Sequence, residues 1–205
     1  MKTKLQKILL AAALGTSLLS GCAPLVVGGA VVGGMVAVDR RTSGTQLEDE
    51  AIELKVANAI NKEMGERVHL NVTSYNRRVL LTGEIRSDAD RSRATLLAQS
   101  QENVNQVVND LAIGAPSSIS QRTKDVVTSG QVKAAFVDAK DLQASAVKVV
   151  TERGTVYLMG RVTAREAQRA TDIARGTSGV AKVVRLFEEI SEQELQRLSQ
   201  PPLSR

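Results

Sequence analysis

The sequence is poor in the residues that carry redox, metal and stacking chemistry. Its 205 residues include one cysteine, one histidine, two tyrosines, two phenylalanines and no tryptophan. A single cysteine excludes an intramolecular disulfide, and no cysteine, histidine and carboxylate residues stand at a usual metal-ligand spacing. So few aromatic side chains are also poor material for stacking nucleic-acid bases. We therefore predict no metal site and no nucleic-acid partner.

The sequence also contains few residues that could act in catalysis. The histidine, His69, stands in the alternating run Val68-His69-Leu70-Asn71-Val72, which is typical of a strand. Because no cysteine or paired-carboxylate motif lies near it in the sequence, we interpret it as a solvent-facing strand residue. The glycine pairs at 28–29 and 33–34 form no phosphate loop, since no strand-turn-helix unit with a following lysine surrounds them. We predict no catalytic residue, no enzyme activity and no cofactor.

The N-terminus has the pattern of an export signal. Lys2, Lys4 and Lys7 precede an apolar run over 8–19, and Leu19-Ser20-Gly21-Cys22 follows. A basic start, a short apolar core and small residues before a cleavage point indicate a secretory signal over 1–21, too short to span a bilayer comfortably. The last four residues resemble a bacterial lipobox, which implies a covalent lipid on Cys22. Two or three acyl chains would anchor the protein stably, at about 0.8 kcal/mol per buried methylene.

A tether is predicted between the lipid and the folded part, over 22–45. Its segment 25–38 is strongly apolar but, at fourteen residues, too short to cross about 30 Å of hydrocarbon as a helix. A flexible tether near the membrane surface is one interpretation, and a self-associating helix is the other. Ala23, rather than aspartate, follows the cysteine. By resemblance to Gram-negative lipoproteins, this implies the inner leaflet of the outer membrane, with the protein facing the periplasm.

The rest of the chain is a duplication. The run V-L-L-T-G-E-I at 79–85 matches V-Y-L-M-G-R-V at 156–162, and the similarity continues on both sides. Apolar periodicity predicts the order helix, strand, strand, helix, strand twice, in domains over 46–114 and 115–190 with a tail over 191–205. The expected elements of the first domain are 49–62, 68–72, 79–85, 87–101 and 104–113. Those of the second are 122–137, 145–151, 155–163, 164–177 and 180–190.

This pattern resembles the BON domain. The resemblance rests on the α-β-β-α-β order, the V-x-L-x-G strand ends at Gly83 and Gly160, the alanine-rich second helices and the Gly179-Val180 approach to the last strand. It implies an α+β fold in which each domain packs a three-stranded mixed sheet on two helices. Two such domains behind a lipobox resemble the dual-BON outer-membrane lipoproteins of the division- and outer-membrane-stress-associated lipid-binding type. In that type the second domain is the one associated with anionic phospholipid.

Charge is divided unevenly along the chain. The formal net charge is +5, but three lysines leave with the signal peptide, so the mature chain is nearly neutral. Residues 46–114 hold eight basic and eleven acidic residues, whereas 115–190 hold twelve basic and eight acidic ones. An exported, anchored protein meets anionic phospholipid first, and each Lys or Arg near such a surface contributes about 1 kcal/mol. The second domain is therefore the candidate for membrane contact.

The first helix of the second domain combines valines with lysines. If Val132, Ala135 and Phe136 supply its core face, Val126 or Val127 projects outward as an apolar wedge; in the alternative, both valines pack under the linker or on the first domain. The predicted lipid-binding residues are Lys124, Val126, Val127, Gly130 and Lys133. The leading hypothesis is thus a lipoprotein that binds anionic phospholipid and supports outer-membrane integrity. The second is an accessory protein whose domains bind an envelope protein partner.

Overall fold

The computed structural model describes residues 39–65 and 68–198. The predicted signal peptide, the lipid on Cys22 and the tether as far as residue 38 lie outside the described residues. Among the described residues, no helix has both the length and the hydropathy needed to cross a bilayer.

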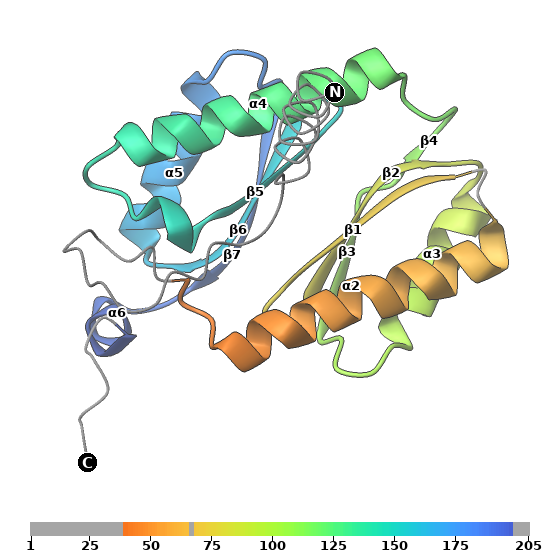
Figure 1. The fold of residues 1–205 in the computed structure, drawn as a ribbon, viewed down its shortest axis with the longest axis horizontal. Helices are drawn as coiled ribbons and strands as arrows, with labels where there is room; N and C mark the ends of the chain where they lie inside the picture. Colours follow the sequence, from red (N-terminus) through yellow and green to blue (C-terminus); the bar gives the residue numbers. More distant parts are fainter. Residues whose placement is uncertain (1–38, 66–67, 199–205) are drawn as a thin grey trace, which may run out of the picture. The chain divides into compact units, whose positions relative to one another are not determined.

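The first domain follows the predicted order (Figure 1). Its elements are α2 (Ser43–Met64), β1 (His69–Tyr75), β2 (Arg78–Ile85), α3 (Asp88–Gln99), β3 (Gln106–Asn109) and β4 (Ala112–Ile113). β1 and β2 form an antiparallel hairpin, and β3 and β4 both pair in parallel with β2. The single last strand expected over 104–113 is interrupted at Asp110 and Leu111. There Asn109 Oδ1 accepts the Leu111 N–H, and Leu111 is buried.

The second domain repeats this arrangement. Its elements are α4 (Ile119–Asp138), a short 3₁₀ helix η2 (Ala144–Ala146), β5 (Lys148–Glu152), β6 (Thr155–Val162), α5 (Ala164–Gly176) and β7 (Lys182–Glu189). β5 pairs antiparallel and β7 pairs parallel with the central β6. A tail helix, α6 (Glu192–Leu198), follows, with the Ser191 hydroxyl accepting the Glu194 N–H. The α+β class with two mixed sheets, each packed on helices, is confirmed.

Each domain has its own apolar core between sheet and helices. In the first domain α2 contributes Ile52, Val56 and Ile60, all at most 1% exposed, at the spacing of one helix face. In the second, α4 contributes Val132 and Phe136 to the corresponding position. The helix α3 contributes Ala94 and Ala98, and α5 contributes three buried alanines, because small side chains let a helix lie close to a sheet.

The other faces of the two sheets share a third apolar cluster. Tyr75 and Leu80 of the first domain lie with Tyr157 and Met159 of the second, and all four are at most 5% exposed. Hydrogen bonds between the two domains surround this cluster. In one of them, Tyr157 Oη donates to the Asp110 carboxylate at 2.7 Å. Burial raises the pKa of both tyrosines. The two domains are thus held by buried apolar surface in addition to their linker.

The start of the first domain differs from the sequence prediction. Helix α2 begins at Ser43, with Thr42 as N-cap, so the helix start expected at residue 49 is wrong. Asp49 lies inside the helix, 2% exposed, and faces the β1–β2 hairpin. Arg40, placed in the predicted tether, is 6% exposed. It donates to the Glu166 carboxylate of the second domain through Nη1 at 2.8 Å and Nη2 at 2.7 Å. The folded part therefore includes residues before 45.

The hairpin turns of the two domains correspond to each other. Tyr75 pairs with Arg78 and Glu152 with Thr155, so the two-residue loops are Asn76-Arg77 and Arg153-Gly154. All four loop residues have positive φ, as type I′ turns require.

The glycine of each V-x-L-x-G strand end allows a close backbone approach. A Cβ on Gly83, which has φ +113°, would lie 2.0 Å from the His69 carbonyl oxygen. A Cβ on Gly160 would lie 2.3 Å from the carbonyl oxygen of Ala146. In both cases the obstacle is backbone, which cannot rotate away.

Alanine at Gly83 or Gly160 is therefore expected to lower the free energy of unfolding by about 2 to 3 kcal/mol, through overpacking. The matched control is Gly176→Ala at the end of α5, where a Cβ meets open space, and its effect should be neutral or slightly stabilising. Urea unfolding followed by circular dichroism measures all three. Equal stability of Gly83→Ala and Gly176→Ala would contradict the steric explanation.

Candidate functional site

Helix α4 is held with one face in the core and the opposite face outward. The hydroxyl of its N-cap, Ser118, accepts the Gln121 N–H at 3.2 Å. Asp125, Thr128, Val132 and Phe136 are buried at intervals of three and four residues, which is one side of a helix. The intervening positions must therefore point away from the sheet.

The structure places all five predicted lipid-binding residues at exposed positions of α4. Val126 is 72% and Val127 53% exposed, and Lys124, Gly130 and Lys133 are exposed beside them. Packing of both valines under the linker or on the first domain is thereby excluded.

Two further apolar residues lengthen this surface and were missed by the sequence reading. Ile119 is 81% and Val137 72% exposed. Ile119, Val126 and Val137 are seven and eleven residues apart, close to two and three helical turns, so that they fall along one side of α4. That spacing is the sequence signal that could have found them. We call the exposed apolar and basic side of α4 the α4 face, comprising Ile119, Arg122, Lys124, Val126, Val127, Gly130, Lys133 and Val137.

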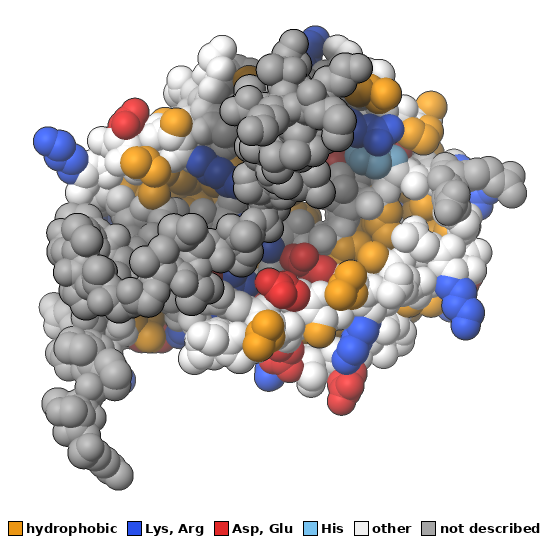
Figure 2. Space-filling model, viewed as in Figure 1, with side chains coloured by type: hydrophobic (Ala, Val, Ile, Leu, Met, Phe, Trp, Pro, Cys, Tyr) orange, Lys and Arg blue, Asp and Glu red, His pale blue; other side chains and the backbone are white. Residues whose placement is uncertain are grey.

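The one acidic residue between Ile119 and Val137, Asp125, is turned inward. It is 5% exposed, and its carboxylate accepts the N–H groups of Arg153 and Gly154, each at 2.9 Å. Its charge is thus directed to the β5–β6 turn rather than to the solvent. Val126 and Val127 are thus left with basic neighbours, whereas the exposed Asp138 follows Val137 at the end of α4. Figure 2 shows hydrophobic and basic side chains at the surface over α4.

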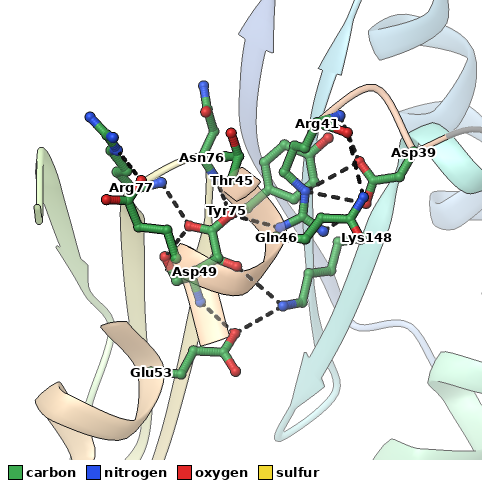
Figure 3. Close-up of polar contacts among 12 residues, drawn as sticks. Asp39, Arg41, Thr45, Gln46, Asp49, Glu53, Tyr75, Asn76, Arg77 and Lys148 are labelled. Carbon is green, nitrogen blue, oxygen red and sulfur yellow. Dashed lines mark hydrogen bonds and ion pairs between the residues drawn. The ribbon is translucent and has the colours of Figure 1, made fainter. Parts of the chain in front are cut away.

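A second polar cluster surrounds Asp49, which is the counterpart of Asp125. Its carboxylate accepts the Ser74 hydroxyl at 2.6 Å, the N–H groups of Asn76 and Arg77 at 2.8 Å, and Arg41 Nη1 at 2.7 Å (Figure 3). Burial alone would raise the pKa of Asp49, but these hydrogen bonds outweigh it and hold the pKa below its usual range. Since every contact is made within the chain, this cluster fixes the hairpin on α2 rather than offering a ligand site.

Two further contacts lie beside the Asp49 cluster, and the first of them joins the two domains. Lys148 of β5 donates to the Glu53 carboxylate at 3.0 Å and to the Ser74 carbonyl at 3.2 Å (Figure 3). The Arg41 guanidinium carbon lies 4.2 Å from the centre of the Tyr75 ring, a distance suited to a cation–π contact.

The expectation that His69 faces solvent is wrong. Its side chain is 15% exposed, and its Nδ1 lies 2.9 Å from Glu84 Oε2 and 4.0 Å from Glu152 Oε1. Burial raises the pKa of Glu152, although the Asn71 amide and His69 act in the opposite direction. The sequence could not show this group, because Glu152 comes from the other domain.

Comparison with known proteins identifies the fold family. Residues 48–115 and 124–189 each match the BON domain. The chain belongs to the BON-domain family. We refer to the unit from α2 to β4 as BON domain 1 and to the unit from α4 to β7 as BON domain 2.

Three relatives show how far the similarity extends. The chain is 43% identical over 175 residues to the outer membrane lipoprotein DolP of Haemophilus influenzae, covering 84% of this chain and 90% of the relative. It is 32% identical over 152 residues to a 21 kDa hemolysin of Actinobacillus pleuropneumoniae, covering 73% and 78%. It is 28% identical over 144 residues to the osmotically-inducible protein Y of Escherichia coli, covering 68% and 72%.

These matches confirm several sequence-based expectations. The chain is a DolP-like outer membrane lipoprotein with two BON domains, in agreement with the predicted anchoring that faces the periplasm. The match to the BON domain and to an outer membrane lipoprotein also confirms the expectation that the chain is not an enzyme.

The two BON domains differ in charge at matched positions of their first helices. Asp49 and Asp125, which cap equivalent turns, set the alignment of α2 on α4. Where BON domain 2 has Lys124 and Val126, BON domain 1 has Glu48 and Glu50. The basic apolar surface is therefore a property of the second domain.

Proposed function

We propose that the protein binds anionic phospholipid through the α4 face of BON domain 2 and so supports outer-membrane integrity. The observation that carries this proposal is the exposure of Val126 and Val127 between Lys124 and Lys133, where the one carboxylate between those lysines, Asp125, is buried. Exposed valines beside basic side chains suit the boundary between headgroups and acyl chains.

The energies involved are modest but sufficient for an anchored protein. Arg122, Lys124 and Lys133 contribute about 1 kcal/mol each near an anionic surface, or about 3 kcal/mol together. Two valines that enter the interfacial region contribute on the order of 1 kcal/mol each, since only part of each side chain leaves water. Because the lipid on Cys22 keeps BON domain 2 near the bilayer, a weak site is occupied often.

The test is co-sedimentation of residues 37–205, the compact unit that keeps Arg40 and Arg41, with vesicles of neutral lipid or of lipid containing phosphatidylglycerol or cardiolipin. We expect binding to the anionic vesicles only. It should weaken strongly when the ionic strength rises from about 0.1 M to about 1 M, since the screening length falls from about 10 Å to about 3 Å.

Glutamate at Val126 or Val127 is expected to weaken this binding by at least about tenfold, because it places a negative charge in the contact. The matched control is Leu54→Glu: Leu54 is 66% exposed on α2, the equivalent helix of BON domain 1. It makes the same chemical change on the other domain and should leave binding unchanged. Equal loss in both variants, or no binding to either vesicle, would refute the proposal.

The second candidate is binding to an envelope protein partner. The exposed apolar residues of α4 suit a protein as well as a lipid, and an interface built on them would resist salt. The salt dependence in the vesicle experiment thus separates the two candidates.

A further inference from the structure

A histidine and two glutamates converge where BON domain 1 meets BON domain 2. His69 comes from β1, Glu84 from β2 and Glu152 from β5. One ligand atom of each lies within 4.8 Å of the other two. A transition metal with bonds of about 2.0 to 2.2 Å holds its ligand atoms about 3 to 4 Å apart, so little movement separates this arrangement from a coordinating one.

Glu84 supplies an oxygen that lacks a donor. Its side chain is 3% exposed, and Oε2 accepts the Ser117 N–H at 2.9 Å. Its Oε1 makes no hydrogen bond among the described residues. A buried carboxylate oxygen without a hydrogen-bond donor is unusual, and a bound cation would supply the partner that it lacks.

Glu152 is oriented in a similar manner. Asn71 of β1 donates to its Oε2 at 2.7 Å, which leaves Oε1 on the side of His69. Hydrogen bonds that fix one oxygen of a carboxylate and leave the other available are the outer support that metal ligands commonly have.

The local charge also favours a cation. Two buried carboxylates face one imidazole, and among the described residues the basic side chain paired with this group is Arg153, whose Nε lies 3.9 Å from Glu84 Oε1. The Arg153 side chain is 49% exposed, so it can turn into solvent when a stronger cation takes its place.

We propose that His69, Glu84 and Glu152 form a site for a divalent transition-metal ion that links the two BON domains. An imidazole nitrogen with two carboxylate oxygens suits Zn²⁺ better than Mg²⁺ or Ca²⁺, which take oxygen ligands. Glu84 lines an open hollow together with Ser117, Gln121 and Arg153, and water from that hollow would complete the coordination. No spacing in the sequence indicates this site, because its ligands come from two domains.

The test uses the full lipidated chain in detergent micelles, without a histidine tag, so that His69 is the only imidazole. Addition of Zn²⁺ is expected to shift the ¹⁵N resonances of His69 with one-to-one stoichiometry and to raise the unfolding temperature, whereas Mg²⁺ should do neither. Lack of any Zn²⁺-dependent shift at His69 would overturn the proposal.

Variants separate this site from casual binding at surface carboxylates. Glu152→Gln and His69→Gln should each weaken Zn²⁺ binding by at least about tenfold. Glu102→Gln, at a side chain 78% exposed, should leave it unchanged. Arg153→Asn, which matches Asn76 in the other turn, should tighten it by removing the competing charge. Unchanged affinity in a folded Glu152→Gln or His69→Gln protein would refute the site. If neither variant folds, the Zn²⁺-dependent shift of the His69 resonances in the unaltered protein is the deciding test.

Discussion

Replacement of Asp49 by alanine is expected to lower the free energy of unfolding by about 3 to 5 kcal/mol at neutral pH. The change removes the acceptor for the Ser74 hydroxyl and for the N–H groups of Asn76 and Arg77, the two turn residues with positive φ. It also takes one of the two carboxylate partners from Arg41. A loss of that size is a large part of the stability of an ordinary domain.

Two variants control for this prediction. Asp49→Asn keeps one acceptor oxygen and should cost less than alanine, while Asp125→Ala should cost a comparable amount, because Asp125 caps the equivalent turn. Urea unfolding of residues 37–205 gives the three values. A cost below about 1 kcal/mol for Asp49→Ala would show that water replaces the carboxylate without penalty.

The second large effect concerns Arg40 and Glu166, whose side chains are 3% and 4% exposed. Glu166 also closes the capping box of α5, where it accepts the Thr163 N–H at 2.9 Å. Replacing Arg40 with methionine keeps a long side chain but leaves a buried carboxylate without its cation. We expect a loss of about 3 to 5 kcal/mol at neutral pH.

This loss should depend on pH. Burial raises the pKa of Glu166, but the hydrogen bonds from Arg40 and the Thr163 N–H and the Arg40 charge outweigh it, so the pKa lies below its usual range. The stability that this group contributes is full above the unfolded pKa of about 4.3 and is lost as the pH falls through the folded value. Without Arg40, burial raises the pKa of Glu166 instead. Protonation of Glu166 at low pH then removes the buried unpaired charge, so the variant loses less stability there.

The difference between the unaltered protein and Arg40→Met is therefore expected to shrink on acidification. Urea unfolding of both proteins at pH 7 and near pH 4 measures it. A difference that stays constant between the two pH values would mean that Arg40 acts through packing rather than through its charge.

The sequence predicted those features that depend on neighbouring residues. The alternation around Val79 and Val156 and the repeated glycines located the strands and the duplication, because period and turn chemistry are local properties. The outward position of Val126 and Val127 followed from the spacing of Val132 and Phe136 on one helix.

What the sequence did not predict depends on contacts between distant residues. Arg40 meets Glu166, and His69 faces Glu152, across 126 and 83 residues of chain, which no local pattern records. The buried role of Asp49 inside α2 was not predicted, because its partners, the N–H groups of Asn76 and Arg77, belong to a hairpin later in the chain. The shared apolar cluster around Tyr75 and Tyr157 is a property of the packed domains.

The most direct measurement of membrane contact uses the scarcity of cysteine. With Cys22 acylated, a cysteine placed at Val126 is the one free thiol in the chain and takes a polarity-sensitive fluorophore. The same label at Leu96, 56% exposed on α3 of BON domain 1, is the control. Both lipidated proteins are placed in neutral and in anionic vesicles, so that the anchor is present throughout. We predict a blue shift at position 126 in anionic vesicles alone and none at position 96. An unchanged spectrum at 126, or the same shift at both positions, would contradict docking by the α4 face.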